Sequence, residues 1–105
     1  CNEIFIIQYL TFQMDSEQKQ KIKKFFDQIN EIDHNLMQLL ISRFSIYSKI
    51  GELKINHELR TLESDYEKQI LDKFSEEYYG ALNQEQIKSI FSPIFRISDI
   101  AQKRR

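Results

Sequence analysis

Two basic residues, Arg43 and Lys54, carry the first chemical signal in this sequence of 105 residues. Arg43 stands where a regular helical pattern calls for an apolar side chain, and a cation there needs an anionic partner because burying an unpaired charge is costly. Lys54 follows eleven residues later, close to three helical turns, so both cations share a face about 16 Å apart along the axis. A bidentate arginine and a lysine point charge at this spacing could hold a small polyanion between them.

Each of the two cations also has a purely structural interpretation. Arg43 could form a buried ion pair with a glutamate or aspartate across a dimer interface. Lys54 could be a cation near a helix C-terminus, where the helix dipole favours positive charge.

Two further pairs of polar residues occur at helical spacing. Glu63 and Glu67 are four residues apart, and so are Ser98 and Gln102, so each pair lies on one helix face. Taken alone, the first pair is typical of a solvated surface and the second of a helix that loses its amphipathic pattern near its end. Together with the two cations, they predict one pocket that is built from three helices.

The chemistry of this pocket is electrostatic. The sequence shows no recognisable pairing of a nucleophile with a base, and neither His34 nor His57 has an acid–base partner at a recognisable spacing. With Cys1 as the single cysteine, no cysteine metal cluster is expected either. We expect a site that binds an anionic metabolite, needs no cofactor and no metal, and acts by positioning and charge.

The composition limits the elements that can position these residues. Hydrophobic residues make up 41% of the chain and charged residues 30%, which is typical of a folded globular protein. The net charge of −1 offers no basic field for nucleic acid. Two glycines and one proline are too few for a fold of many strands and turns, so the sequence predicts an all-α protein.

The first predicted helix is very long, from about residue 16 to residue 54, with Asp15 or Ser16 as its cap. At 1.5 Å per residue it measures roughly 55–60 Å, whereas a compact domain of this size has a radius of gyration of about 13 Å. We therefore expect it to pack along the same helix of a second chain in an intertwined homodimer. Its pattern runs in steps of three and four, as in a heptad pattern, with Arg43 as the one charged member: Ile22, Phe25, Ile29, Ile32, Leu36, Leu39, Arg43, Ile46 and Ile50.

Two shorter helices are predicted to follow, over residues 58–79 and 84–103. Gly80 is a candidate C-terminal cap for the second helix. Asn83 and Gln86 are spaced as a capping box for the third. Pro93 lies inside the third helix, and we expect a kink there rather than a new helix starting at Ser92, because the apolar pattern continues through it. The sequence thus predicts three helices in a single domain, 1–105, with residues 1–14 as an N-terminal extension.

The chain starts at Cys1 rather than methionine, which we interpret as a processed or trimmed product. A mature lipoprotein would also begin with cysteine. The apolar stretch "IFIIQYLTF" is too short to span a membrane. We expect a cytoplasmic protein without a membrane partner, although a lipoprotein or exported form is compatible with the first residue.

Four segments of the sequence together resemble a known family. "INEIDHNLMQLLISR" followed by "IGELK", then "ESDYEKQIL", then "IKSIFSPIFRISDIAQ" are similar to the all-helical class of chorismate mutases. The resemblance covers roughly Ile22 to Gln102. It implies a three-helix intertwined dimer that converts chorismate, a dianion, to prephenate.

The resemblance implies specific roles for the polar residues. Arg43 would bind a substrate carboxylate, Lys54 a carboxylate and the ether oxygen, and Ser98 a carboxylate. Gln102 would donate to the ether oxygen, and Glu67 would accept a hydrogen bond from the substrate hydroxyl. The implied catalytic residues are Arg43, Lys54, Glu67 and Gln102, and the substrate-binding residues are Arg43, Lys54, Glu63, Ser98 and Gln102.

Two positions depart from the family pattern. Phe26 stands where the family normally has an arginine that reaches the partner subunit's site, and Tyr66 where it commonly has another arginine. Lys23, Lys24 or Arg60 could compensate for the lost charge. The departures leave two alternatives: a non-catalytic mutase-fold dimer with a regulatory or interaction role, and the related isochorismate pyruvate lyase, although Glu67 is atypical of the lyases.

Overall fold

The computed structural model describes residues 15–53 and 57–103, and every described element is a helix. These helices are α2 (Ser16–Gly51), α3 (His57–Glu77) and α4 (Gln84–Lys103). The predicted all-α fold with three helices is confirmed. The chain divides into two compact units, residues 1–38 and 39–105, and α2 contributes to both. Each unit is described below by itself, and the predicted single domain stays a prediction.

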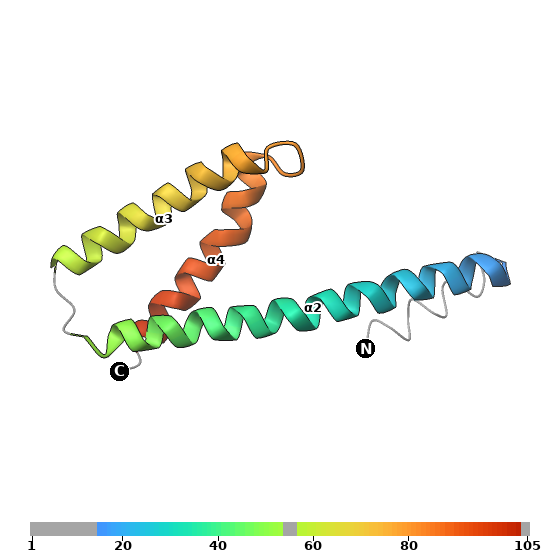
Figure 1. Cartoon of the computed structure of the whole chain (residues 1–105), viewed down its shortest axis with the longest axis horizontal. Coiled ribbons are helices and arrows are strands. Elements are labelled where there is room, and N and C mark those ends of the chain that lie inside the picture. Colours follow the sequence, from blue (N-terminus) through green and yellow to red (C-terminus); the bar gives the residue numbers. More distant parts are fainter. Residues whose placement is uncertain (1–14, 54–56, 104–105) are drawn as a thin grey trace. The chain divides into compact units, whose positions relative to one another are not determined.

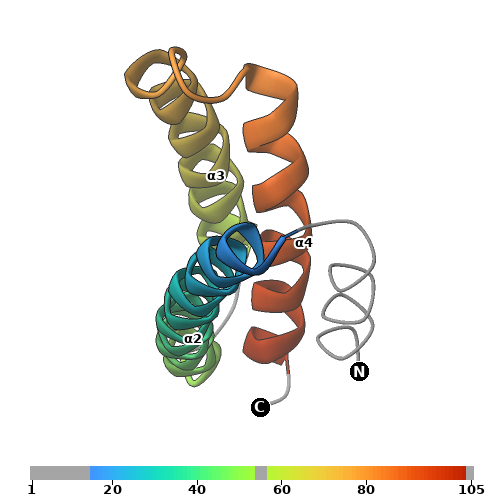
Figure 2. The ribbon, with the colours of Figure 1, turned by 90° about the vertical axis from the view of Figure 1, so that its right-hand side faces the viewer.

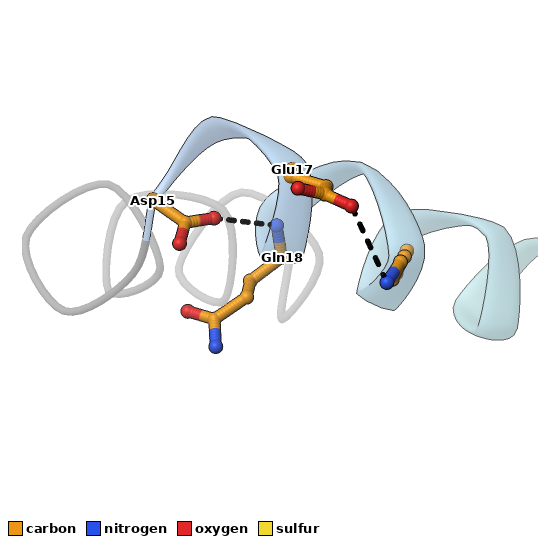
Figure 3. A network of polar contacts seen from close by, with 4 residues as sticks. Asp15, Glu17 and Gln18 are labelled. Carbon is orange, nitrogen blue, oxygen red and sulfur yellow. Dashed lines mark hydrogen bonds and ion pairs between the residues drawn. The ribbon is translucent and has the colours of Figure 1, made fainter.

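The start of α2 follows directly from its capping residue. The Asp15 carboxylate accepts a hydrogen bond of 2.8 Å from the backbone N–H of Gln18, and Glu17 forms an ion pair with Lys21 at 3.5 Å (Figure 3). The side-chain oxygen of Asp15 thus satisfies one of the N–H groups that have no partner within the helix. Of the two predicted caps, Asp15 is the one that the structure uses.

The described part of the first unit contains the N-terminal half of α2. None of its described residues is buried. The apolar positions predicted from the heptad pattern are open to solvent on the single chain, with Phe25 60% and Ile32 62% exposed. An amphipathic helix with an uncovered apolar face needs another surface to bury it.

In the second unit, α2 ends at Gly51, three residues before the predicted end. The backbone N–H groups of Glu52 and Leu53 bond the carbonyls of Lys49 and Ile50, so the last turn tightens to three-residue spacing. A β-carbon at Gly51 would overlap the backbone oxygen of Gln102, so the helix can pass the end of α4 this closely only with glycine at that position. Lys54 lies outside the described residues.

A turn joins α3 to α4, and the two helices form a hairpin (Figures 1 and 2). Gly80, the candidate C-terminal cap, does not adopt the positive φ that is usual for a glycine in this role, since no described glycine has one. Instead, the N–H groups of Tyr78 and Leu82 bond the carbonyls of Phe74 and Tyr78. The turn therefore continues the helical hydrogen bonding and does not need glycine's conformational freedom.

The start of α4 is the capping box that the sequence predicts. Asn83 Oδ1 accepts from the N–H of Gln86 at 2.8 Å, and Gln86 Oε1 accepts from the N–H of Asn83 at 2.9 Å. The helix then runs unbroken through Pro93 to Lys103, as expected from the continuous apolar pattern. The kink at Pro93 stays a prediction.

The packing of the second unit combines aromatic and polar side chains. Phe91 contacts Phe74 and Phe95, with ring centroids 5.4 and 5.7 Å apart. The deepest side chains, however, include two polar ones: Ser98 is 1% exposed and Gln102 3%. Buried polar groups need hydrogen-bond partners, so these two residues mark where the helices form a polar site. In the described part of the chain, no helix is both long and apolar enough to cross a membrane.

Candidate functional site

Arg43 of α2 points its guanidinium toward α4. Its Nη1 donates a hydrogen bond of 2.5 Å to Ser98 Oγ, and Ser98 in turn donates to the backbone carbonyl of Ile94 at 2.7 Å. Among the described residues, no carboxylate forms an ion pair with Arg43. The cation is therefore anchored by a neutral hydroxyl within its own chain. An ion pair across a dimer interface, the structural alternative, is not tested by a single chain.

Gln102 links α4 to α3. Its side-chain Nε2 donates a hydrogen bond to Oε1 of Glu63, and the amide is almost fully buried. Because a carboxylate can only accept, this contact holds the NH₂ end of the Gln102 amide toward Glu63. The tight passage at Gly51 lies directly against the backbone of the same glutamine.

Glu67 lies one helical turn after Glu63 on α3, and its surroundings disfavour its charge. Burial raises the pKa of the Glu67 carboxyl above its usual value. The neighbouring Glu63 and Asp99 raise this pKa further, and Arg43 opposes them. Glu67 thus lies within electrostatic reach of both Arg43 and Glu63, as predicted for members of one site.

Two cavities are lined by Arg43, Glu63, Glu67 and Gln102, and Glu63 lines both of them. One, of about 370 Å³, is lined by Arg60, Glu63, Ser64, Glu67, Phe95, Arg96, Asp99 and Gln102. The other, of about 420 Å³, is lined by Arg43, Ile46, Tyr47, Ile50, Leu62, Glu63 and Tyr66. The structure therefore brings five of the six predicted residues together within the second unit.

The positions that depart from the family pattern lie in different parts of the chain. Tyr66 lines the same cavity as Arg43, where an arginine would have placed a second charge. Phe26 belongs to the first unit and is exposed. Of the three residues that could compensate, Arg60 lines the cavity that contains Glu67 and Gln102, and Arg96 of α4 lines it too.

Two residues near Arg43 were missed by the sequence interpretation. The centroid of the Tyr47 ring lies 5.0 Å from the guanidinium carbon of Arg43, and that of Phe95 lies 5.5 Å away. Tyr47 follows Arg43 by four residues and Phe95 precedes Ser98 by three, so helical spacing could have drawn attention to both. Both had the simpler explanation of residues in an apolar core.

The described residues contain no group of three or more His, Cys, Asp and Glu side chains that could hold a metal ion. What the arrangement can do chemically is bind, because a hydrogen-bonded guanidinium, an oriented amide and a carboxylate of raised pKa line two cavities that share Glu63. The arrangement is a polar site between three helices, and comparison with known families assigns the chain to a class.

The family model described as chorismate mutase type II matches residues 25–103. The chain belongs to the chorismate mutase type II family, whose all-helical fold agrees with the three helices described above. No curated protein matches the chain, and no solved structure does.

Proposed function

We propose that this protein is a chorismate mutase, which rearranges chorismate to prephenate in aromatic amino acid biosynthesis. The observation that supports the proposal most strongly is that polar side-chain contacts join three helices. Arg43 of α2 bonds Ser98 of α4, and Gln102 of α4 bonds Glu63 of α3. Membership of the family supports the same reaction class.

In this proposal the enzyme makes no covalent intermediate. Arg43 binds one substrate carboxylate while Ser98, whose proton is given to the carbonyl of Ile94, holds the guanidinium, and Lys54 contacts a carboxylate and the ether oxygen. The reaction then proceeds because the substrate is held in its compact reactive conformation, while charge that develops on the ether oxygen meets fixed donors.

Gln102 is suited to be one of these donors. Its amide carries two N–H groups, of which one is used by Glu63. In the proposed complex the second donates to the ether oxygen. Glu63 thereby orders the amide, and Glu67 accepts from the substrate hydroxyl.

The charge of a dianionic substrate needs more than Arg43. In the proposed complex Lys54 supplies a second cation, and Arg60 and Arg96 contribute from the wall of the cavity that they share with Gln102. This would offset part of the charge lost at Phe26 and Tyr66.

The proposed active form is a homodimer. The exposed apolar face of α2 supports it, because Phe25, Ile29, Ile32 and Leu36 are each at least 48% exposed on the single chain. Burying such a row of side chains against an identical row is the usual solution for a heptad pattern.

The deciding experiment mixes purified protein with chorismate and follows loss of substrate absorbance and formation of prephenate. We expect turnover well above the uncatalysed rate and binding of a bicyclic transition-state mimic. Absence of both would refute the proposal.

Tyr66 motivates the alternative of a non-catalytic mutase-fold module. Among the described residues that line the same cavity as Tyr66, Arg43 is the sole cation. In that case the parent protein is inert, and Phe26→Arg creates or raises mutase activity. An active parent whose rate falls on Arg43→Ala excludes this alternative. Product analysis with isochorismate separates the mutase from a pyruvate lyase.

A further inference from the structure

The guanidinium of Arg43 contacts two aromatic rings. The Tyr47 ring, one helical turn further along α2, lies 5.0 Å from the guanidinium carbon, and the Phe95 ring of α4 lies 5.5 Å away. Both distances are within the range in which a cation is attracted to the face of an aromatic ring. Tyr47 is also the one buried residue of the described α2, so its ring is held firmly in the packing.

A third contact comes from the same face of α4. Ser98 follows Phe95 by three residues, so one helix supplies both the ring and the hydroxyl that meet Arg43. The hydroxyl proton of Ser98 is given to the carbonyl of Ile94, which leaves the oxygen to accept from Arg43. The serine cannot reverse this role without losing its own hydrogen bond.

These contacts leave most of the donor capacity of Arg43 for a ligand. A guanidinium has five N–H donors in one plane, and Ser98 accepts from one of them. The Tyr47 hydroxyl takes part in a second side-chain hydrogen bond with Arg43, whereas the ring contacts themselves consume no donor, so donors remain for a carboxylate, which needs two of them side by side. An arginine that is already ordered also loses less conformational freedom when a ligand binds.

We propose that Tyr47 and Phe95 are positioning residues that clamp the Arg43 guanidinium in the orientation in which it binds a substrate carboxylate. This inference rests on the proposed function for the identity of the ligand, but the clamp itself is a property of the free protein. It gives the site a pre-ordered cation in the cavity where Tyr66 supplies none.

The clamp can be tested without substrate by NMR of the arginine side chains. The Nε–H signal of Arg43 is assigned by its loss in Arg43→Lys. In the parent we expect the Nε–H group of Arg43 to be rigid on the fast timescale and its chemical shift to be displaced by the two rings. The Nε–H group of the exposed Arg96 should show neither effect. Tyr47→Leu should make the Nε–H group of Arg43 mobile, whereas Tyr47→Phe, which keeps the ring, should leave it rigid.

The functional arm measures affinity for the bicyclic dicarboxylate mimic by calorimetry. Tyr47→Leu should weaken binding about tenfold and Tyr47→Phe less than twofold, in line with a lost cation–ring contact. Phe91→Leu is the matched control. Phe91 belongs to the same aromatic row of α4 as Phe95, but its ring is not one of the two that contact Arg43. Phe95→Leu replaces Tyr47→Leu if thermal unfolding shows that the latter does not fold.

Two results would overturn the clamp: an Arg43 signal in the parent as mobile as that of Arg96, or a mimic affinity that stays unchanged in Tyr47→Leu or, where that variant does not fold, in Phe95→Leu. A parent that does not bind the mimic refutes the proposed function instead, and the NMR comparison then decides the clamp alone.

Discussion

Arg43 donates to a serine hydroxyl rather than to a carboxylate of its own chain. A neutral partner satisfies one donor but leaves the positive charge of the guanidinium without an ion pair among the described residues. A buried ion pair, by contrast, would have neutralised the charge and made the residue structural. This difference favours a role in binding an anion.

At this scale the first prediction concerns Arg43→Ala. We expect kcat/KM for chorismate to fall roughly 30- to 1000-fold, because removing a charged contact to a bound ligand costs about 2–4 kcal/mol. Lys49→Ala is the control, since Lys49 is an exposed cation on the same helix and should leave the kinetics unchanged. Equal losses in both variants would show that the effect is general electrostatics and not a specific contact.

Glu67 gives a prediction about pH. Because burial and the neighbouring carboxylates raise its pKa in the folded protein, the folded state holds this proton more tightly than the unfolded state does. Stability should therefore decrease as pH rises from the unfolded pKa, near 4.5, through the raised folded pKa. In Glu67→Gln this decrease should be smaller.

The measurement is the thermal midpoint of both proteins across that pH window. The Gln variant should gain on the parent as pH rises, and the two should converge at lower pH, where the parent carboxyl is protonated. Glu76→Gln, at an exposed position on the same helix, serves as the control. A constant difference between parent and Glu67→Gln across the window would contradict the prediction.

At the scale of elements, the site depends on how closely the end of α2 approaches the end of α4. Gly51 permits this approach, since a β-carbon there would also come within 2.9 Å of the carbonyl carbon of Gln102. Gln102, whose side-chain amide is proposed above to be catalytic, thus has its backbone directly against Gly51. At Gly51, the packing of α2 against α4 therefore also affects the position of Gln102.

Gly51→Ala should destabilise the protein by about 1–3 kcal/mol, the usual cost of overpacking, and should also lower activity by displacing Gln102. Gly80→Ala is a matched control, because its β-carbon would meet nothing within 4 Å and its φ is not positive. That variant should be neutral or more stable by about 0.4–1 kcal/mol. Chemical denaturation of both variants checks the contrast, and equal stability changes would count against the close approach.

For the whole molecule, the exposed apolar face of α2 is the main observation. Isolated exposed apolar residues are common, but a row at heptad spacing is typical of a helix whose partner is missing. The proposed partner is a second copy of this chain. Neither of the other described helices matches its length, since α3 has 21 residues and α4 has 20 against the 36 of α2.

We expect sedimentation to give about twice the chain mass of 12.7 kDa. Ile32→Asp should shift the protein to monomer, because it places a charge in the apolar row. His34→Asp adds the same charge at an exposed position two residues away, on another face of the helix, and should stay dimeric. A monomeric parent, or dimers in all three proteins, would exclude this face as the dimer interface.

Much of the fold could be predicted because its causes are local in the chain. The Asp15 cap and the Asn83–Gln86 capping box are each formed by residues three apart, and the bounds of α4 agree with the prediction. The end of α2 was less predictable. It depends on the last turn and on the contact of Gly51 with a residue far along the chain.

For the site, sequence and structure answered different questions. Residue type and helical spacing were enough to nominate Arg43, Glu67 and Gln102, because a charge or an amide on an apolar helix face is visible in the sequence. Which groups they meet was decided only by the tertiary structure: Arg43 and Ser98 are 55 residues apart, and Gln102 and Glu63 are 39. The rings beside Arg43 were hidden for the same reason, since aromatic residues fit an apolar core equally well until the packing of α2 against α4 brings them to the cation.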